Sequence, residues 1–489
     1  MTPGVAFPAA ADGTRSTTST GRDIVADALR AADPVGARAV ENETAWRSRY
    51  LQHFRRLVEA GVDTPAAWLT IADAGLAAVH ERLVLDGSDK GSAGADAALS
   101  TLLTAPASRT LTTVEVTGGG TPGRELCLPY DGRALRGQDL RGQLAIWARQ
   151  GVLEPSAVDA VGDVIDHPEW LRLDGRTVVV LGAGAEMGPV GPLLGWGARV
   201  AAVDLPRPVV WERILKQARA SAGSLLVPAS GDGRGDLAAS AGADLLTEVP
   251  EIADWLGGLD GRLVVGNYLY ADGGVHVRLS VAADLLGLRV TAARPDTGRA
   301  FLATPTDVFV VPRSAVEQST EVYVGRSRTA KLVGRPLRWI TRGGLMHRAY
   351  PPDADPGIAD ALVPAQGPNY VLAKRIQRWR AATARRDGQL VSFHVAPSTR
   401  TRSVVKNRAL AAAYAGARRF GVEIFEPDTA NTLMAALLVR DLAGGPVAHD
   451  HPWQDEAHAA VHGGLWRSAY EPRSMLGLAA VLGYAASRR

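Results

Sequence analysis

The stretch TVVVLGAGAEMG, residues 177–188, decides the fold of this chain of 489 residues. It opens with a β-branched apolar run, typical of a strand buried on both faces of a parallel sheet, and a glycine-rich turn follows at once. A segment long enough for a helix leads to a second apolar run over 198–203, which ends in Asp204. Strand, glycine turn, helix, strand and acid together predict a βαβ unit.

The alternation of buried strands and helical segments continues to about residue 442. Short apolar runs predict the strands, and apolar residues at helical spacing predict the helices between them. Strands are expected at 224–227, 263–266, 300–303 and 391–395, and helices at 211–220, 249–256, 275–286, 370–384 and 403–419. This order predicts an α/β fold with a doubly wound parallel sheet of the Rossmann-like kind.

The chain divides into regions of different composition. Residues 1–22 are rich in Ala, Thr, Ser and Gly without periodicity, which predicts a flexible tail. Helical spacing of apolar residues through much of 23–170 predicts a mostly helical N-terminal domain. The Rossmann-like domain is expected over 171–445 with an inserted lid at about 313–366, and a helical extension over 446–489.

The composition is that of a globular protein. The 54 Lys and Arg residues nearly balance the 51 Asp and Glu residues, so no nucleic-acid partner is expected. The single cysteine, Cys127, excludes an internal disulfide, and no apolar run reaches the roughly 18 residues of a membrane span. The first 20 residues lack the charged start and apolar run of a signal peptide, so we expect a cytoplasmic location.

The glycine turn carries the first chemical prediction, which is dinucleotide binding. In such a turn glycines allow an unusual backbone conformation, close approach of a pyrophosphate, and close packing of helix on strand. Asp204 stands where a ribose-binding carboxylate belongs and favours NAD, whereas Arg207 would suit the 2′-phosphate of NADP. The alternative is a tight turn that binds nothing. The cofactor-binding candidates of this unit are Gly182, Gly184, Glu186, Met187, Gly188, Asp204 and Arg207.

The second motif is Tyr-Val-Leu-Ala-Lys, residues 370–374. A spacing of four places the phenol and the ammonium on one face of a helix. We expect the cation of Lys374 to lower the pKa of Tyr370 from its usual value near 10, so that the phenol can transfer a proton near neutral pH. The chain holds only five lysines, so chance rarely produces this spacing. The alternative is an ordinary surface pair.

The third motif follows the strand over 391–395 and reads Ala-Pro-Ser-Thr-Arg-Thr, residues 396–401. The order of the three motifs, with the glycine turn first, the Tyr-x-x-x-Lys pair second and this segment third, resembles that of the short-chain dehydrogenase/reductase family. The resemblance covers about residues 176–442. It implies that Pro397 and Thr401 border the nicotinamide, with Ser398 where that family usually has glycine.

The resemblance also implies the roles of the catalytic side chains. Tyr370 corresponds to the general acid/base, and Lys374 to the lysine that binds the nicotinamide ribose. The family's serine after the fifth strand has no identical match, and Thr304 or Thr306 stands in its place as a hydroxyl that polarises a substrate carbonyl. Asn267 is the nearest match to the family's Asn-Asn-Ala-Gly element after the fourth strand.

The interval between Thr306 and Tyr370, 64 positions, is far longer than in the family and accounts for the predicted lid. Its basic and apolar residues suit a substrate with an acidic handle and an apolar body, such as an acyl thioester; a solvated helical face is the plainer interpretation.

His276, after the fourth strand, is a weaker active-site candidate. Of the late histidines at 449, 451, 458 and 462, the last two have the i, i+4 spacing that could hold a metal. They lack the Glu of a His-Glu-x-x-His pattern, so ordinary surface or packing histidines are expected and no metal site.

The sequence therefore predicts an NAD(P)-dependent oxidoreductase, with NAD favoured, that transfers hydride between nicotinamide and a small carbonyl, alcohol or enoyl substrate. One alternative is a non-catalytic dinucleotide-binding sensor or scaffold, because the serine is missing and the Asn-Ala-Gly element is altered. Another is a nucleotide-like cofactor used for chemistry other than redox. A homo-oligomer is expected by analogy with the family alone.

Overall fold

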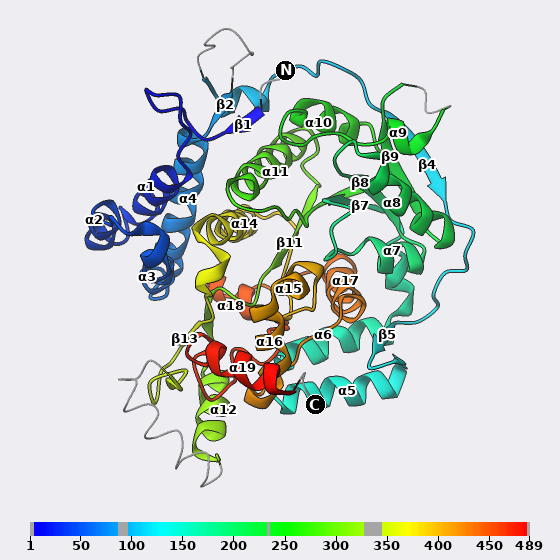
Figure 1. The fold of residues 1–489 in the computed structure, drawn as a ribbon. Coiled ribbons are helices and arrows are strands. Elements are labelled where there is room, and N and C mark those ends of the chain that lie inside the picture. Colours follow the sequence, from blue (N-terminus) through cyan, green and yellow to red (C-terminus); the bar gives the residue numbers. More distant parts are fainter. Residues whose placement is uncertain (1–3, 87–95, 232–234, 327–344, 487–489) are drawn as a thin grey trace.

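The computed structural model describes residues 4–86, 96–231, 235–326 and 345–486. At its centre lies a seven-stranded sheet with the order β14-β11-β10-β7-β8-β9-β4 (Figure 1). The strands are β4 (Thr112–Thr117), β7 (Arg176–Leu181), β8 (Arg199–Val203), β9 (Ser224–Ala229), β10 (Arg262–Asn267), β11 (Gly298–Ala303) and β14 (Val391–Val395). Every neighbouring pair is parallel except β4 with β9.

The six parallel strands have the order of a Rossmann-like sheet. Counted from β7, they run 3-2-1-4-5-6 across the sheet. The predicted α/β fold class is therefore confirmed. The strand order reverses between β7 and β10, which places a crevice for ligands at their carboxyl ends.

Alternate residues of each central strand face two different apolar cores. In β7, Val179 and Leu181 belong to one core, while Val178 and Val180 belong to the other. Residues of three helices pack on the sheet in the first core: α10 (Val249–Gly257), α11 (Gly274–Ala293) and α14 (Pro368–Arg386). Four N-terminal helices contribute to the same core: α1 (Thr17–Leu29), α2 (Pro34–Glu41), α3 (Trp46–Glu59) and α4 (Pro65–Arg82). The second contains α5 (Gly137–Arg149), α6 (Pro155–Asp166), α7 (Val190–Trp196), α8 (Pro208–Ala220) and α17 (Pro427–Gly444). The sheet is thus covered by helices on both faces.

Smaller elements surround these layers. The strands are β1 (Gly4–Ala6), β2 (Val84–Asp86), β3 (Ala97–Ala98), β5 (Cys127–Tyr130), β6 (Arg133–Arg136), β12 (Val308–Val311) and β13 (Gly357–Asp360). The helices are α9 (Leu237–Ser240), α12 (Arg313–Val324), α15 (Arg402–Lys406), α16 (Arg408–Ala417), α18 (Pro452–Ala457) and α19 (Pro472–Ala486), with short 3₁₀ turns at Leu99–Leu103, Pro168–Arg172, Pro364–Gln366 and Arg418–Phe420. None of the helices within the described ranges is long and apolar enough to span a bilayer.

The N-terminal residues differ from the expected flexible tail. Gly4–Ala6 form the buried strand β1, which pairs with β2, and the N–H of Val5 donates to the Leu246 carbonyl at 2.9 Å. Helix α1 already begins at Thr17. A short apolar cluster around Val5 is buried by contacts far along the chain, and composition alone cannot show such contacts.

Buried charges fix α14 to the rest of the fold. Arg375 Nη2 lies 2.9 Å from Asp307 Oδ1, and Arg378 Nη1 lies 2.8 Å from Asp307 Oδ2. Arg378 also pairs with Glu456 of α18 at 2.5 Å, and its guanidinium stacks over Phe309 at 4.1 Å. The pairs are almost fully buried, so removing one partner leaves an unpaired charge in a low-dielectric interior.

Replacing Arg378 with Leu should therefore lower the free energy of unfolding by about 3–5 kcal/mol, because Asp307 loses one ion pair and Glu456 loses its partner. Arg386→Leu is the matched control on the same helix, since Arg386 is partly exposed and its loss should cost about 0–1 kcal/mol. Urea unfolding of the two variants measures the difference. Equal losses would contradict an anchoring role for the buried network.

Candidate functional site

The glycine turn joins β7 to α7 at the point where the strand order reverses. Gly182 has φ +84°, and a Cβ there would lie 3.2 Å from the Leu269 Cα, so both its conformation and its surroundings require glycine. At Gly184 a Cβ would lie 2.7 Å from Val210 Cγ1 of α8. The turn is therefore packed tightly against the segment after β10 and against α8.

Asp204 lies beside this turn, at the carboxyl end of β8. Its Oδ2 accepts a hydrogen bond from the Gly184 N–H at 2.7 Å, and its Oδ1 accepts one from the Leu205 N–H at 2.8 Å. The carboxylate is half-buried, while Arg207 is exposed at the start of α8. The backbone thus holds the acid against the turn, where a ribose hydroxyl could reach it.

An amide from α17, which sequence reasoning missed, closes the other side of the turn. Asn431 Oδ1 accepts from the Gly188 N–H at 3.0 Å, and its Nδ2 donates to the Glu186 carbonyl at 2.9 Å. More than 240 positions separate these partners, so no local pattern announces the contact. Met187, between them, is half-buried and packs against the second core.

The segment after β14 lies against the same turn. The backbone N–H of Arg402, at the start of α15, donates to Glu186 Oε2 at 2.9 Å. Pro397 and Ser398 are buried, and Thr401 directly precedes α15. The two segments that the resemblance assigned to the cofactor therefore meet.

Asn267, the buried last residue of β10, accepts from the Leu269 N–H at 3.3 Å and shapes the turn that follows.

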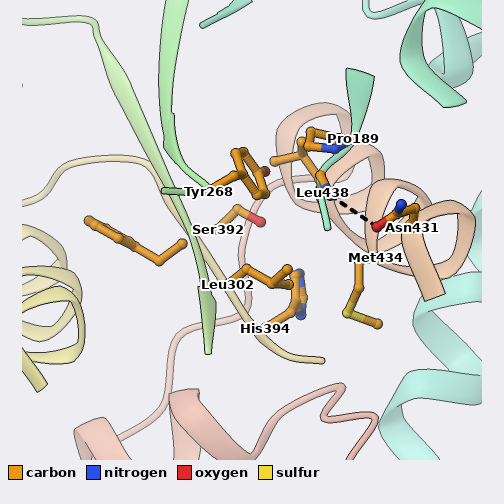
Figure 2. Close-up of a pocket in the computed structure, with 10 residues that line it drawn as sticks. Pro189, Tyr268, Leu302, Ser392, His394, Asn431, Met434 and Leu438 are labelled. Atoms are coloured by element: carbon orange, nitrogen blue, oxygen red, sulfur yellow. Dashed lines mark hydrogen bonds between the residues drawn. The ribbon is translucent and has the colours of Figure 1, made fainter. Parts of the chain in front are cut away.

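A small cavity lies between this edge of the sheet and α17 (Figure 2). Its volume is about 10 Å³, enough for roughly one water molecule. Two residues that line the cavity share a carboxylate. His394 Nε2 lies 2.8 Å from Asp441 Oδ2, and the Ser392 hydroxyl donates to the same oxygen at 2.8 Å. The carboxyl pKa of Asp441 is lowered by these contacts against the opposing effect of burial. The sequence analysis missed this buried group as well. The residues around the cavity are Gly188, Pro189, Tyr268, Phe301, Leu302, Ser392, His394, Asn431, Met434 and Leu438.

Tyr370 and Lys374 lie one turn apart on α14, next to the carboxyl end of β11. Lys374 Nζ donates to the Leu302 carbonyl at 3.1 Å and to Gln377 Oε1 at 3.3 Å. Tyr370 shares a hydrogen bond with Thr304, the first residue after β11. The pair is therefore at the edge of the sheet where the glycine turn also lies.

The two threonines after β11 are linked to each other. Their hydroxyl oxygens lie 2.9 Å apart, and Gln366 Nε2 donates to the Thr306 hydroxyl at 2.7 Å. Thr304 contacts Tyr370 directly, whereas Thr306 is linked to the tyrosine through the hydroxyl of Thr304. Sequence reasoning proposed both threonines and missed Gln366.

The expected effect of Lys374 on the tyrosine is wrong. Burial raises the pKa of Tyr370 well above its usual value, and the hydrogen bond with Thr304 opposes that rise only in part. Burial also lowers the pKa of Lys374 from 10.5 to about 8. The desolvation of both groups outweighs charge effects at this site, so the phenol is protonated at neutral pH.

His276, in the first turn of α11, packs against the tyrosine. Its ring centroid lies 5.4 Å from that of Tyr370 and 5.8 Å from that of Tyr270, and its side chain is fully buried. Burial, helped by the charge of Lys374, lowers the pKa of His276 to about 3. The imidazole is therefore neutral at neutral pH.

The other predicted features lie elsewhere. The described part of the predicted lid packs on the C-terminal segment, where Ser319 Oγ donates to the Ser468 carbonyl at 2.7 Å and the Tyr350 hydroxyl to the Trp466 carbonyl at 2.6 Å. Most of its basic residues, at 327–344, lie outside the described residues. His462 pairs with Glu154 at 3.0 Å and His449 with Asp455 at 2.9 Å. No group of three or more potential metal ligands occurs among the residues described.

The lowered pKa of Lys374 predicts how stability depends on pH. Between about pH 8 and 10.5 the unfolded chain keeps a proton that the folded chain has lost, so raising the pH stabilises the folded state. Relative to Lys374→Met, the wild-type free energy of unfolding should rise across this window by on the order of 1–3 kcal/mol. Urea unfolding at several pH values measures this, with the exposed Lys406→Met as control. A constant difference between wild type and Lys374→Met would contradict the shifted pKa.

Comparisons with known proteins identify no family. No protein-family model matches the chain, and no curated protein matches it. One solved structure with some similarity is described as a thiolation-reductase di-domain from an archaeal non-ribosomal peptide synthetase. The alignment has 13% identity and a TM-score of 0.28, and it covers 53% of this chain and 52% of that one. At that TM-score the similarity supports no assignment, and the fold class rests on the strand order described above.

Proposed function

We propose that the protein is an NAD(P)-dependent oxidoreductase of the short-chain dehydrogenase/reductase type. The observation that carries the proposal is the convergence of Tyr370, Thr304 and Lys374 at the carboxyl end of β11. The glycine turn and Asp204 lie along the same edge, at the ends of β7 and β8. A nicotinamide cofactor held at the turn would cross the sheet edge toward the tyrosine.

The raised pKa of Tyr370 favours the reductive direction. A bound nicotinamide would supply the hydride for the substrate carbon, and the phenol of Tyr370 would donate its proton to the carbonyl oxygen that receives the π electrons. The tyrosinate then recovers a proton from solvent, so the balance is carbonyl, NAD(P)H and one proton to alcohol and NAD(P)⁺. Reduction of an enoyl group would use the same phenol to stabilise the enolate oxygen.

Lys374 and Thr304 support the tyrosine in different ways. Two N–H groups of Lys374 are engaged by Leu302 and Gln377, and the third is the one that would hold a ribose hydroxyl. Thr304 fixes the orientation of the phenol. An acyl thioester remains the substrate class that suits the basic insertion, and a homo-oligomer remains part of the proposal by analogy alone.

A non-catalytic dinucleotide-binding protein is the second candidate. It is favoured by the lack of a serine after β11, where Thr304 and Thr306 stand, and by the altered element after β10, where Asn267 is the nearest match to the family's Asn-Asn-Ala-Gly. Turnover of a carbonyl substrate separates this candidate from the first.

Tyr370→Phe should lower the rate of hydride transfer by about 100-fold or more, because the variant lacks the phenol proton that the substrate oxygen would receive. NADH affinity should change little, since the ring and its packing on His276 remain. The measurement is nicotinamide absorbance with a panel of ketones and enoyl thioesters, alongside NADH binding by fluorescence. Tyr130→Phe, which removes a hydroxyl 3.2 Å from Glu423, is the control. Full activity of Tyr370→Phe would exclude the mechanism.

Asp204→Asn should weaken NADH binding by about 10–100-fold, because charge-assisted hydrogen bonds to the ribose are worth roughly 1.5–3 kcal/mol. NADPH binding should fall less, since the carboxylate no longer repels the 2′-phosphate. Titration calorimetry with both cofactors gives the ratio. Asp236→Asn is the control, because Asp236 also accepts a backbone N–H, from Ala238 at 3.0 Å. An unchanged ratio of affinities would count against Asp204 as the ribose ligand.

A further inference from the structure

Around Tyr370, the threonine hydroxyls that the structure describes supply no second donor for a substrate oxygen. Gln366 donates to Thr306, and the hydroxyls of Thr306 and Thr304 are bonded to each other. With Thr306 donating to Thr304, the single proton of Thr304 goes to the oxygen of Tyr370, and the phenol proton is left for the substrate. Thr304 then orients Tyr370 and has no proton for the substrate itself.

His276 is a polar group beside Tyr370 that takes no part in this hydrogen-bond network. Neither of its ring nitrogens has a hydrogen-bond partner among the described residues, although the side chain is fully buried. The Leu269 carbonyl approaches the ring closely enough to raise its pKa slightly, but without hydrogen-bond geometry to either nitrogen. Leaving such a group unpaired costs free energy, so its burial here needs an explanation.

A second histidine shows what a structural role looks like. His462 is equally buried, but its Nε2 lies 3.0 Å from Glu154 and its Nδ1 accepts the Gly464 N–H at 3.1 Å. Both nitrogens of His462 are satisfied by the protein. His276 instead has its ring against Tyr370 and Tyr270, and Tyr270 is 55% exposed. The ring of His276 therefore packs against both tyrosine rings, and neither of its nitrogens has a hydrogen-bond partner among the described residues.

We propose that His276 is a catalytic residue whose neutral imidazole N–H donates a second hydrogen bond to the substrate oxygen that Tyr370 protonates. This inference rests on the proposed function and gives the role of the missing serine to a residue on α11. His276 keeps its proton throughout and stabilises the negative charge that develops on oxygen during hydride transfer. A neutral imidazole is suited to this task because it polarises the carbonyl without competing with Tyr370 as an acid.

The test compares His276→Leu, His276→Gln and His462→Leu with wild type. Each protein is assayed with NADH and with the panel member that wild type turns over fastest. His276→Leu should lower kcat by about 100-fold, while His276→Gln, which keeps an N–H donor, should recover about a tenth or more of the wild-type rate. The dissociation constant of NADH should be unchanged in both.

Thermal unfolding supplies a readout that does not depend on substrate. His276→Leu removes an unpaired buried polar group. Its Tm should therefore not fall below that of wild type, and we expect a rise of about 2 °C. His462→Leu strips Glu154 of a partner and should lower Tm. A large drop in Tm for His276→Leu would show a structural role and overturn the inference.

The remaining outcomes separate the two proposals. If wild type turns over a carbonyl substrate and His276→Leu does so at the same rate, His276 is not a donor, and the proposed function stands. If wild type reduces no member of the panel with either cofactor, the proposed function fails and takes this inference with it.

Discussion

Parallel pairing of β10 with both β7 and β11 is the constraint on which the candidate site depends. Because the three strands run in one direction, their carboxyl ends open at one edge of the sheet. The glycine turn, the segment that leads to His276 and the residue Thr304 all follow from those ends. None of these segments is close to another in sequence, so the sheet alone brings them together.

The position of α14 against that edge depends on buried charge. Asp307 is three residues beyond Thr304 and pairs with Arg375 and Arg378 of the helix that carries Tyr370. One short turn after β11 therefore both supplies the hydroxyl beside the phenol and anchors the helix. Asp307 also opposes the loss of the Lys374 proton. Asp307 thus both pairs with the charges that hold α14 and acts electrostatically on Tyr370 and Lys374.

The mostly helical region before residue 171 packs on the central sheet through contacts that local sequence patterns do not reveal. Strand β4 comes from that region but pairs antiparallel with β9 at the edge of the central sheet. Helices α1 and α4 share a core with α11 and α14, and α6 packs in the other core with α17. Helical spacing predicts the helices, but it does not say which distant surface covers their apolar faces.

By itself the sequence determined the order of the six parallel strands and of most of the helices between them, because apolar periodicity and glycine are local properties that each segment carries wherever it lies. It also placed the glycine turn, Asp204 and the Tyr370–Lys374 pair on the correct elements. Only the tertiary structure decided the sign of the pKa shift at Tyr370, because burial depends on residues distant in the chain. The same reason applies to Asn431 and to the unpaired ring of His276, whose surroundings exist only after the sheet has formed.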